Sequence, residues 1–175
     1  MTTRKFAAFI AVLSIVGAWN NSRAQDEPIP DPPAPGQAPL SEPLHRKSTT
    51  EAWAALRAGE NGLAIAKASE CIDRYQPAAD KIQTILEGDK ADLPAGAVSA
   101  ADRQRIDRYQ ILHDVAACLL IKGWAEERWG QKSEARKTYA KAKKYTYARA
   151  TERPGDPLWS PAELASQGLA RSSSK

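Results

Sequence analysis

A short pattern that occurs twice constrains the fold of this chain more than any other feature. Residues 53–59, WAALRAG, align with residues 124–130, WAEERWG, and both fit W-A-x-x-R-x-G. In each copy an alanine follows five residues after the glycine, at Ala64 and at Ala135. Small residues at helical spacing on both sides of a glycine are typical of two helices that turn back on each other. The repeat therefore predicts antiparallel helical hairpins.

Start and stop signals place the first helices around these glycines. Residues 48–51, STTE, form a capping box, so we expect a helix that starts at Ser48 and ends at Gly59. A second helix should cover residues 61–75, and Pro77 should either stop it or begin a third helix. The expected later segments are a loop over 88–98, one long helix or two nearly continuous helices over 99–129, a helix over 133–149, a loop over 150–157 and a short helix over 160–170. Since no segment shows strand alternation, the predicted class is all-α, with about five or six helices.

The N-terminal residues have the pattern of an export signal. Basic residues precede an apolar run over residues 6–18, and Ser22-Arg23-Ala24 offers a cleavage site after Ala24, with a weaker one after Ala18. A retained membrane anchor is the alternative, but the run is shorter than the roughly 20 residues that cross a bilayer. We therefore expect a periplasmic or secreted protein with no stable membrane insertion after cleavage.

A proline-rich spacer separates this signal from the folded part. Residues 25–43 hold seven of the 12 prolines, which favours extended conformations rather than a core. Removing residues 1–24 takes away three of the 25 basic residues and none of the 21 acidic ones, which leaves a net charge of +1. This small surplus does not indicate nucleic-acid binding. The expected division is signal peptide 1–24, spacer 25–47, helical-repeat domain 48–149, loop and capping helix 150–170, and tail 171–175.

The second copy of the repeat resembles a known family. Gly123, Gly130, Ala135, Tyr139 and Ala142 resemble the small–small–small–aromatic–small spacing of a tetratricopeptide repeat (TPR). The resemblance implies an antiparallel hairpin with Gly123 and Ala142 at close approach.

The first copy departs from this pattern. It has Ala52 where the second copy has Gly123, and Ala68 where the second copy has Tyr139. Because the two copies are roughly two 34-residue repeat lengths apart, a degenerate middle hairpin is expected between them, with Gly96 as its turn.

The resemblance implies a protein or peptide partner bound in a groove formed by the first helix of each hairpin. The groove-facing positions that it implies are Trp53, Leu56, Arg57, Trp124, Glu127 and Arg128. Tryptophan and arginine are common in binding hot spots. The alternative is that both tryptophans are core residues and both arginines are solvated.

Signals for catalysis are weak. None of the common nucleophile, metal or nucleotide motifs occurs, and His113 and Cys118 do not share a helical face. We therefore expect no enzyme, cofactor or metal site. The function predicted is an exported scaffold for protein–protein interaction, and the alternative is a small exported enzyme or accessory factor that acts on cell-envelope polymers.

Two further features concern charge and cysteine. Lys137, Lys141 and Lys144 form a basic stripe, which is either a solvated helix face or a contact for an anionic partner. Cys71 and Cys118 are the two cysteines of the chain, and an oxidising compartment would favour a disulfide between them. Two buried free thiols are the alternative.

Overall fold

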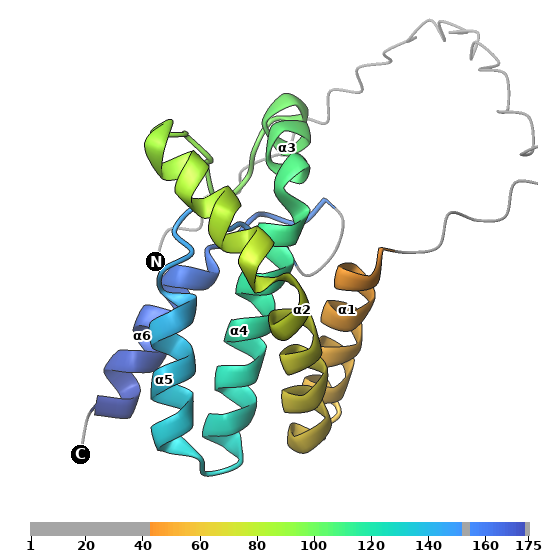
Figure 1. Cartoon of the computed structure of the whole chain (residues 1–175), viewed down its shortest axis with the longest axis vertical. Helices are drawn as coiled ribbons and strands as arrows, with labels where there is room; N and C mark the ends of the chain where they lie inside the picture. The colour runs from red at the N-terminus through yellow and green to blue at the C-terminus, as the bar shows by residue number, and fades with distance from the viewer. Residues whose placement is uncertain (1–42, 152–154, 174–175) are drawn as a thin grey trace, which may run out of the picture. The chain divides into compact units, whose positions relative to one another are not determined.

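Helices form about three quarters of the described structure. The structure, a computed structural model, describes residues 43–151 and 155–173, which belong to one compact unit (Figure 1). The elements are α1 (Leu44–Arg57), α2 (Asn61–Gly88), α3 (Ala100–Ile106), the 3-10 turn η1 (Asp107–Tyr109), α4 (Gln110–Arg128), α5 (Lys132–Ala142) and α6 (Pro161–Ser173). In these residues the only strand-like pairings are two isolated bridges, Gly96 with Leu158 and Ala150 with Trp159. The all-α class is confirmed.

The predicted signal peptide and most of the spacer lie outside the described residues. Across residues 43–151 and 155–173, every helix is too short or too polar to cross a membrane.

The helices pack in a regular order. Helix α2 contacts α1 and α4, α5 contacts α4 and α6, and α4 also contacts both α1 and α6 (Figure 1). Helices α1, α4 and α6 are therefore successive neighbours on one side, and α2 and α5 pack against them on the other. Buried alanines at these interfaces allow close approach, among them Ala52, Ala64, Ala68, Ala116 and Ala135.

Both copies of the repeat end in the same backbone arrangement. Gly59 and Gly130 have φ angles of +79° and +83°, a conformation that a side chain makes costly. In each copy the glycine N–H donates to the carbonyl three residues earlier, and the next N–H donates to the carbonyl five residues before it. These bonds form a Schellman motif, which satisfies the last carbonyls of the helix. The predicted helix end at Gly59 is confirmed, and its repeat at Gly130 has the same local structure.

The side chain of Tyr139 fills the space between three helices. It is fully buried on α5, and a Cβ added to Gly123 would lie 2.5 Å from ring atom Cε1. A Cβ added to Gly168 of α6 would lie 2.7 Å from Cε2 on the opposite ring edge. The predicted close approach at Gly123 is therefore present, but its nearest contact is Tyr139 rather than Ala142.

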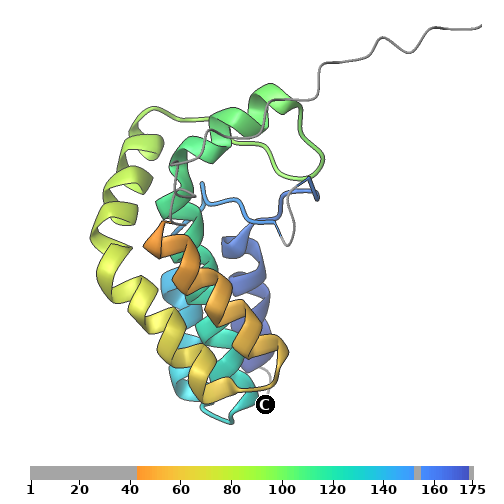
Figure 2. The ribbon, with the colours of Figure 1, turned by 90° about the vertical axis from the view of Figure 1, so that its right-hand side faces the viewer.

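Helix α2 differs most from the prediction. It continues through Pro77 for 28 residues, where a stop or a new helix was expected. Proline removes one backbone hydrogen bond and bends a helix, and both views show α2 changing direction partway along (Figures 1 and 2). The helix persists because its second half buries Ala79, Gln83 and Leu86. No middle hairpin lies in the described residues between the two copies, since α2 packs directly on α4 and Gly96 lies in a loop.

Two other boundaries were wrong. Helix α1 begins at Leu44 after the N-cap Pro43, so Ser48 lies inside it rather than at its start. Helix α5 ends at Ala142 rather than near Arg149, because the chain turns there and buries Tyr145. The predicted caps at Ser99 and Ser160 are confirmed: each hydroxyl accepts a hydrogen bond from the N–H three residues later, at 3.1 and 3.3 Å.

Candidate functional site

The described structure has a cleft of about 730 Å³. Its sides are α1, the α3–η1 segment with the first turns of α4, and residues from 149–151 and 155–158. Three segments distant in sequence thus meet at one surface of the molecule. The cleft is within the 300–1,000 Å³ typical of ligand sites in proteins.

Arginine dominates the polar lining of the cleft. Arg46 and Arg57 come from α1, Arg103 from α3, and Arg149 from the segment after α5. The cleft also holds two aspartates, Asp107 and Asp114, together with His45 and His113. Four arginines against two aspartates make its surface electropositive.

Two side-chain contacts fix the start of α1 against α4. Nδ1 of His45 lies 2.5 Å from a carboxylate oxygen of Asp114, and both side chains are mostly buried, at 15% and 13% exposure. Arg46 donates to the side-chain carbonyl of Gln110. These contacts explain why the helix begins before the capping box, since its first turn is held by α4 instead of by a side-chain cap.

His113 holds the opposite side of the cleft together. Its Nε2 lies 2.8 Å from the carbonyl of Ile106, and its Nδ1 accepts the N–H of Arg149 at 3.1 Å. Nε2 therefore carries the proton and donates it. Burial lowers the pKa of His113 from 6.5 to about 4, so the ring is neutral at physiological pH. This one neutral imidazole ties α3 to the segment that follows α5.

Arg149 is fixed by backbone carbonyls. Its guanidinium donates to Pro94 at 3.2 Å and to Thr146 and Ala148 at 2.8 Å each. Desolvation of the half-buried guanidinium lowers the pKa of Arg149.

Three tryptophans adjoin the cleft. The ring centroid of Trp53 lies 5.7 Å from that of Trp124 and 6.3 Å from that of Trp159, in tilted and edge-to-face arrangements. All three are partly exposed, and Trp53 also lines the cleft. The guanidinium carbon of Arg57 lies 6.0 Å from the Trp53 ring centre, at the outer limit of a cation–π contact.

The six implied groove residues divide into two groups. Trp53 and Arg57 line the cleft, and Trp124 contacts Trp53. Leu56 is 3% exposed, so its expected place in the groove was wrong, because that position packs in the core.

The last two of the six, Glu127 and Arg128, form polar contacts with other residues of the fold. Arg128 donates to the carbonyl of Leu56 at 3.1 Å, which ties the two hairpins together. Glu127 accepts the Tyr139 hydroxyl at 2.7 Å and pairs with Arg171 at 3.5 Å.

The two cysteines are buried free thiols, and not the disulfide that was predicted. The hydroxyl of Thr49 lies 3.2 Å from Sγ of Cys118 and 3.7 Å from Sγ of Cys71. The Thr49 hydroxyl therefore contacts both thiols, which come from α2 and α4. Burial is the main cause that raises the pKa of Cys118.

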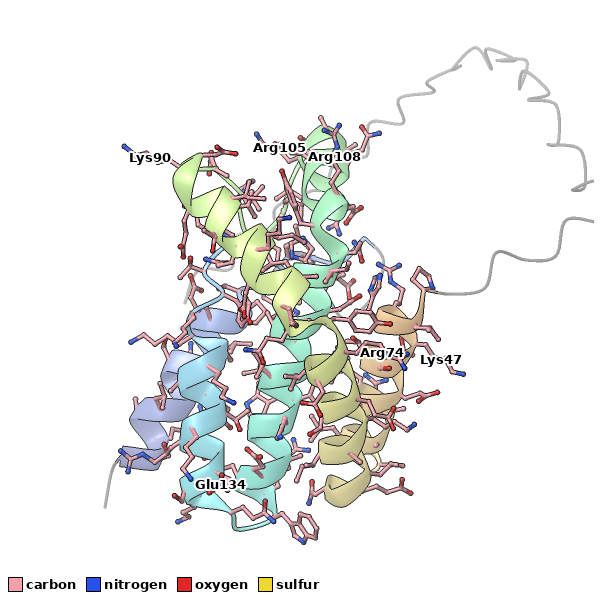
Figure 3. The ribbon with its side chains drawn as sticks, viewed as in Figure 1. Lys47, Arg74, Lys90, Arg105, Arg108 and Glu134 are labelled. Carbon is pink, nitrogen blue, oxygen red and sulfur yellow. The ribbon has the colours of Figure 1, made fainter. Side chains whose placement is uncertain are left out.

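The predicted basic stripe is exposed: Lys137 and Lys141 lie on α5, and Lys144 follows the end of this helix. Lys137 pairs with Glu134, which Figure 3 labels, at 2.8 Å. Lys141 and Lys144 border a second hollow of about 380 Å³, whose lining includes Asp80 and Glu87 of α2. The stripe is thus partly balanced by nearby acids.

Sequence reasoning missed much of the cleft. It assigned His45 and Arg46 to the spacer, and it gave no role to Arg103 or Arg149. No local pattern links these positions, because three separate segments carry them. Among the described residues no group of three or more His, Cys, Asp or Glu side chains is arranged to hold a metal ion. Comparison with known protein families, curated proteins and solved structures finds no match for the chain.

Proposed function

We propose that this chain is an exported scaffold of stacked, tetratricopeptide-like hairpins that binds an extended segment of a protein partner. The observation that carries the proposal is the cleft of about 730 Å³ beside α1 and α4, with Trp53 on its side and Arg57 at its rim. Partly exposed tryptophan and arginine are the residues that contribute most to protein interfaces.

The order of helix packing supports the same function. The first helices of the two hairpins, α1 and α4, lie side by side, and the single helix α6 packs on the other side of α4. Stacked helical repeats pack in this way and use the resulting face for binding. The identical Schellman motifs at Gly59 and Gly130 also support a repeat.

His113 favours binding over catalysis. Both of its ring nitrogens bond to the backbone, Nε2 to the carbonyl of Ile106 and Nδ1 to the N–H of Arg149. A general base needs a ring nitrogen within reach of substrate. The His113 imidazole instead joins two segments of the cleft to each other.

The test is affinity capture from an extract of the source cells, quantified by mass spectrometry. Two variants alter the cleft at exposed positions of α1: Thr50→Trp fills it, and Arg57→Glu reverses a charge at its rim. The matched control is Trp129→Ala, because Trp129 is 57% exposed and lies outside the cleft.

We expect a stoichiometric partner that wild type and Trp129→Ala retain and that both cleft variants lose. All variants should melt within a few degrees of wild type, since the changed side chains are exposed. Retention of the partner by both cleft variants would refute the proposed site, and turnover of an envelope polymer would favour the enzymatic alternative.

A further inference from the structure

We infer that the segment bound in this cleft is acidic: an extended peptide rich in aspartate or glutamate, presented by the protein partner. This inference rests on the proposed function, because it names the ligand chemistry of the same cleft. It is carried by the arginines that line the cleft and by the partners those arginines have.

None of the four arginines forms an ion pair with any carboxylate in the described residues. Arg46 bonds to an amide oxygen, Arg103 to the carbonyl of Asp156 at 2.6 Å, and Arg149 to three carbonyls. Arg57 has no hydrogen bond or ion pair to any described residue, and its guanidinium carbon lies 6.0 Å from the Trp53 ring centre. A guanidinium has five N–H donors, so Arg46, Arg57 and Arg103 keep most of theirs for a ligand.

The acidic residues of the cleft do not balance these charges. Asp114 already bonds to His45, and Asp107 accepts the amide of Gln110 at 3.3 Å. Both aspartates therefore have partners, and the positive charges outnumber them two to one. An anionic ligand would be drawn to this surface and held by charge-assisted bonds.

Arg149 adds a reason based on burial. Its guanidinium is half-buried, and desolvation is the main cause that lowers its pKa. Glu163 and Asp92 act on it only through space, and its hydrogen bonds all go to neutral carbonyls. A ligand carboxylate that enters the cleft would neutralise this charge directly.

The spacing of the arginines favours a peptide over a small anion. Arg46 and Arg57 are eleven residues apart on α1, which separates their Cα atoms by about 16 Å along the helix. An extended peptide covers this distance with about five residues, so it can place one carboxylate at each arginine. Pro43 and the partly exposed Trp53 add apolar surface for the side chains between the carboxylates.

The experiment is calorimetric titration of the full mature chain with two capped peptides. In the first peptide glutamates alternate with alanine and leucine, and in the second each glutamate is glutamine. The cleft variant is the double substitution Arg46→Gln with Arg57→Gln. The control is Arg74→Gln with Arg136→Gln, which removes the same charge from exposed positions outside the cleft (Arg74 is labelled in Figure 3).

The acidic peptide should bind wild type at least about tenfold more tightly than the glutamine peptide, since each charge-assisted bond contributes about that much. The cleft variant should lose about tenfold or more, and the control variant should bind as wild type does. Affinity should fall when the salt concentration rises from about 0.05 M to about 0.5 M.

Three results would overturn the inference. Equal binding of both peptides would reject an acidic ligand but leave the proposed function intact. Displacement of the peptide by an equal concentration of inorganic phosphate would show a general anion site. Absence of binding by either peptide would reject the inference, and the affinity capture described above would then decide separately whether the cleft has a partner.

Discussion

Replacement of Gly123 by alanine tests the packing of α4, α5 and α6 around Tyr139. The added Cβ would lie 2.5 Å from Cε1 and 2.6 Å from Cδ1 of Tyr139, closer than such atoms approach in folded proteins. The ring cannot move away, because Gly168 is as close to its other edge. Its hydroxyl is also held by Glu127 at 2.7 Å.

The expected cost follows from two opposing terms. Overpacking of a filled core costs about 1–3 kcal/mol, and the upper value applies here because the ring is confined on both edges. Alanine in place of glycine inside a helix returns about 1 kcal/mol. The net loss should therefore be about 2 kcal/mol, which lowers the melting temperature by about 8 °C in a domain of this size.

Thermal and urea unfolding followed by circular dichroism would measure this loss. The control is Gly88→Ala, at a helical position where an added Cβ meets no atom within 4 Å, so stability should be unchanged or slightly higher. In a Tyr139→Leu background the cost of Gly123→Ala should largely disappear, as a double-mutant cycle would show. If Gly123→Ala melts together with Gly88→Ala, the account of the α4–α5–α6 packing is wrong.

Three further predictions concern buried polar groups. Glu126 is 4% exposed, burial raises its pKa, and its Oε2 has no hydrogen-bond partner in the described structure. Because a buried charge without a partner is costly, Glu126→Gln should stabilise the fold by on the order of 1 kcal/mol at pH 7. The gain should shrink toward pH 4, where the glutamate is protonated in both states, and a gain that is constant with pH in thermal melts would contradict the reasoning. The pKa of His113 falls from 6.5 to about 4 on folding, so its full contribution to the free energy of unfolding is present above pH 6.5. Between pH 6.5 and 4 the free energy of unfolding should fall by about 1.4 kcal/mol per pH unit. Urea titrations across that range should show a smaller slope in His113→Gln. Cys71 and Cys118 are buried, so a thiol reagent should react with them only after unfolding and should then detect two thiols per chain. If the unfolded protein shows no reactive thiol without reductant, the two cysteines form the predicted disulfide instead.

Local signals in the sequence predicted the helix ends that depend on a few neighbouring atoms. Gly59 ends α1 because a positive φ lets the next two N–H groups reach back to the helix carbonyls. Ser99 and Ser160 start helices because their hydroxyls accept an N–H three residues later. Such bonds form within one turn, so the sequence around them is sufficient.

The predictions failed where contacts distant in sequence decide the outcome. Ser48-Thr49-Thr50-Glu51 has the pattern of a capping box, but the contact of His45 with Asp114, 69 residues away, extends the helix past it. Thr49 is then free to turn its hydroxyl toward the two thiols. The proline rule failed in the same way, since the burial of Leu86 and Gln83 after Pro77 outweighs one lost hydrogen bond.

The same long-range contacts form the cleft. The bend at Pro77 carries the second half of α2 over the segment that follows α5, where Gln83 donates to Thr146 at 3.0 Å and Asp80 accepts the Tyr145 hydroxyl at 2.5 Å. These bonds hold the chain that leads to Arg149, whose N–H donates to His113 and whose guanidinium lines the cleft. A helix that stopped at Pro77 would leave this segment without support and the cleft without one of its sides. The proline that most misled the prediction of the fold is thus part of what positions the candidate site.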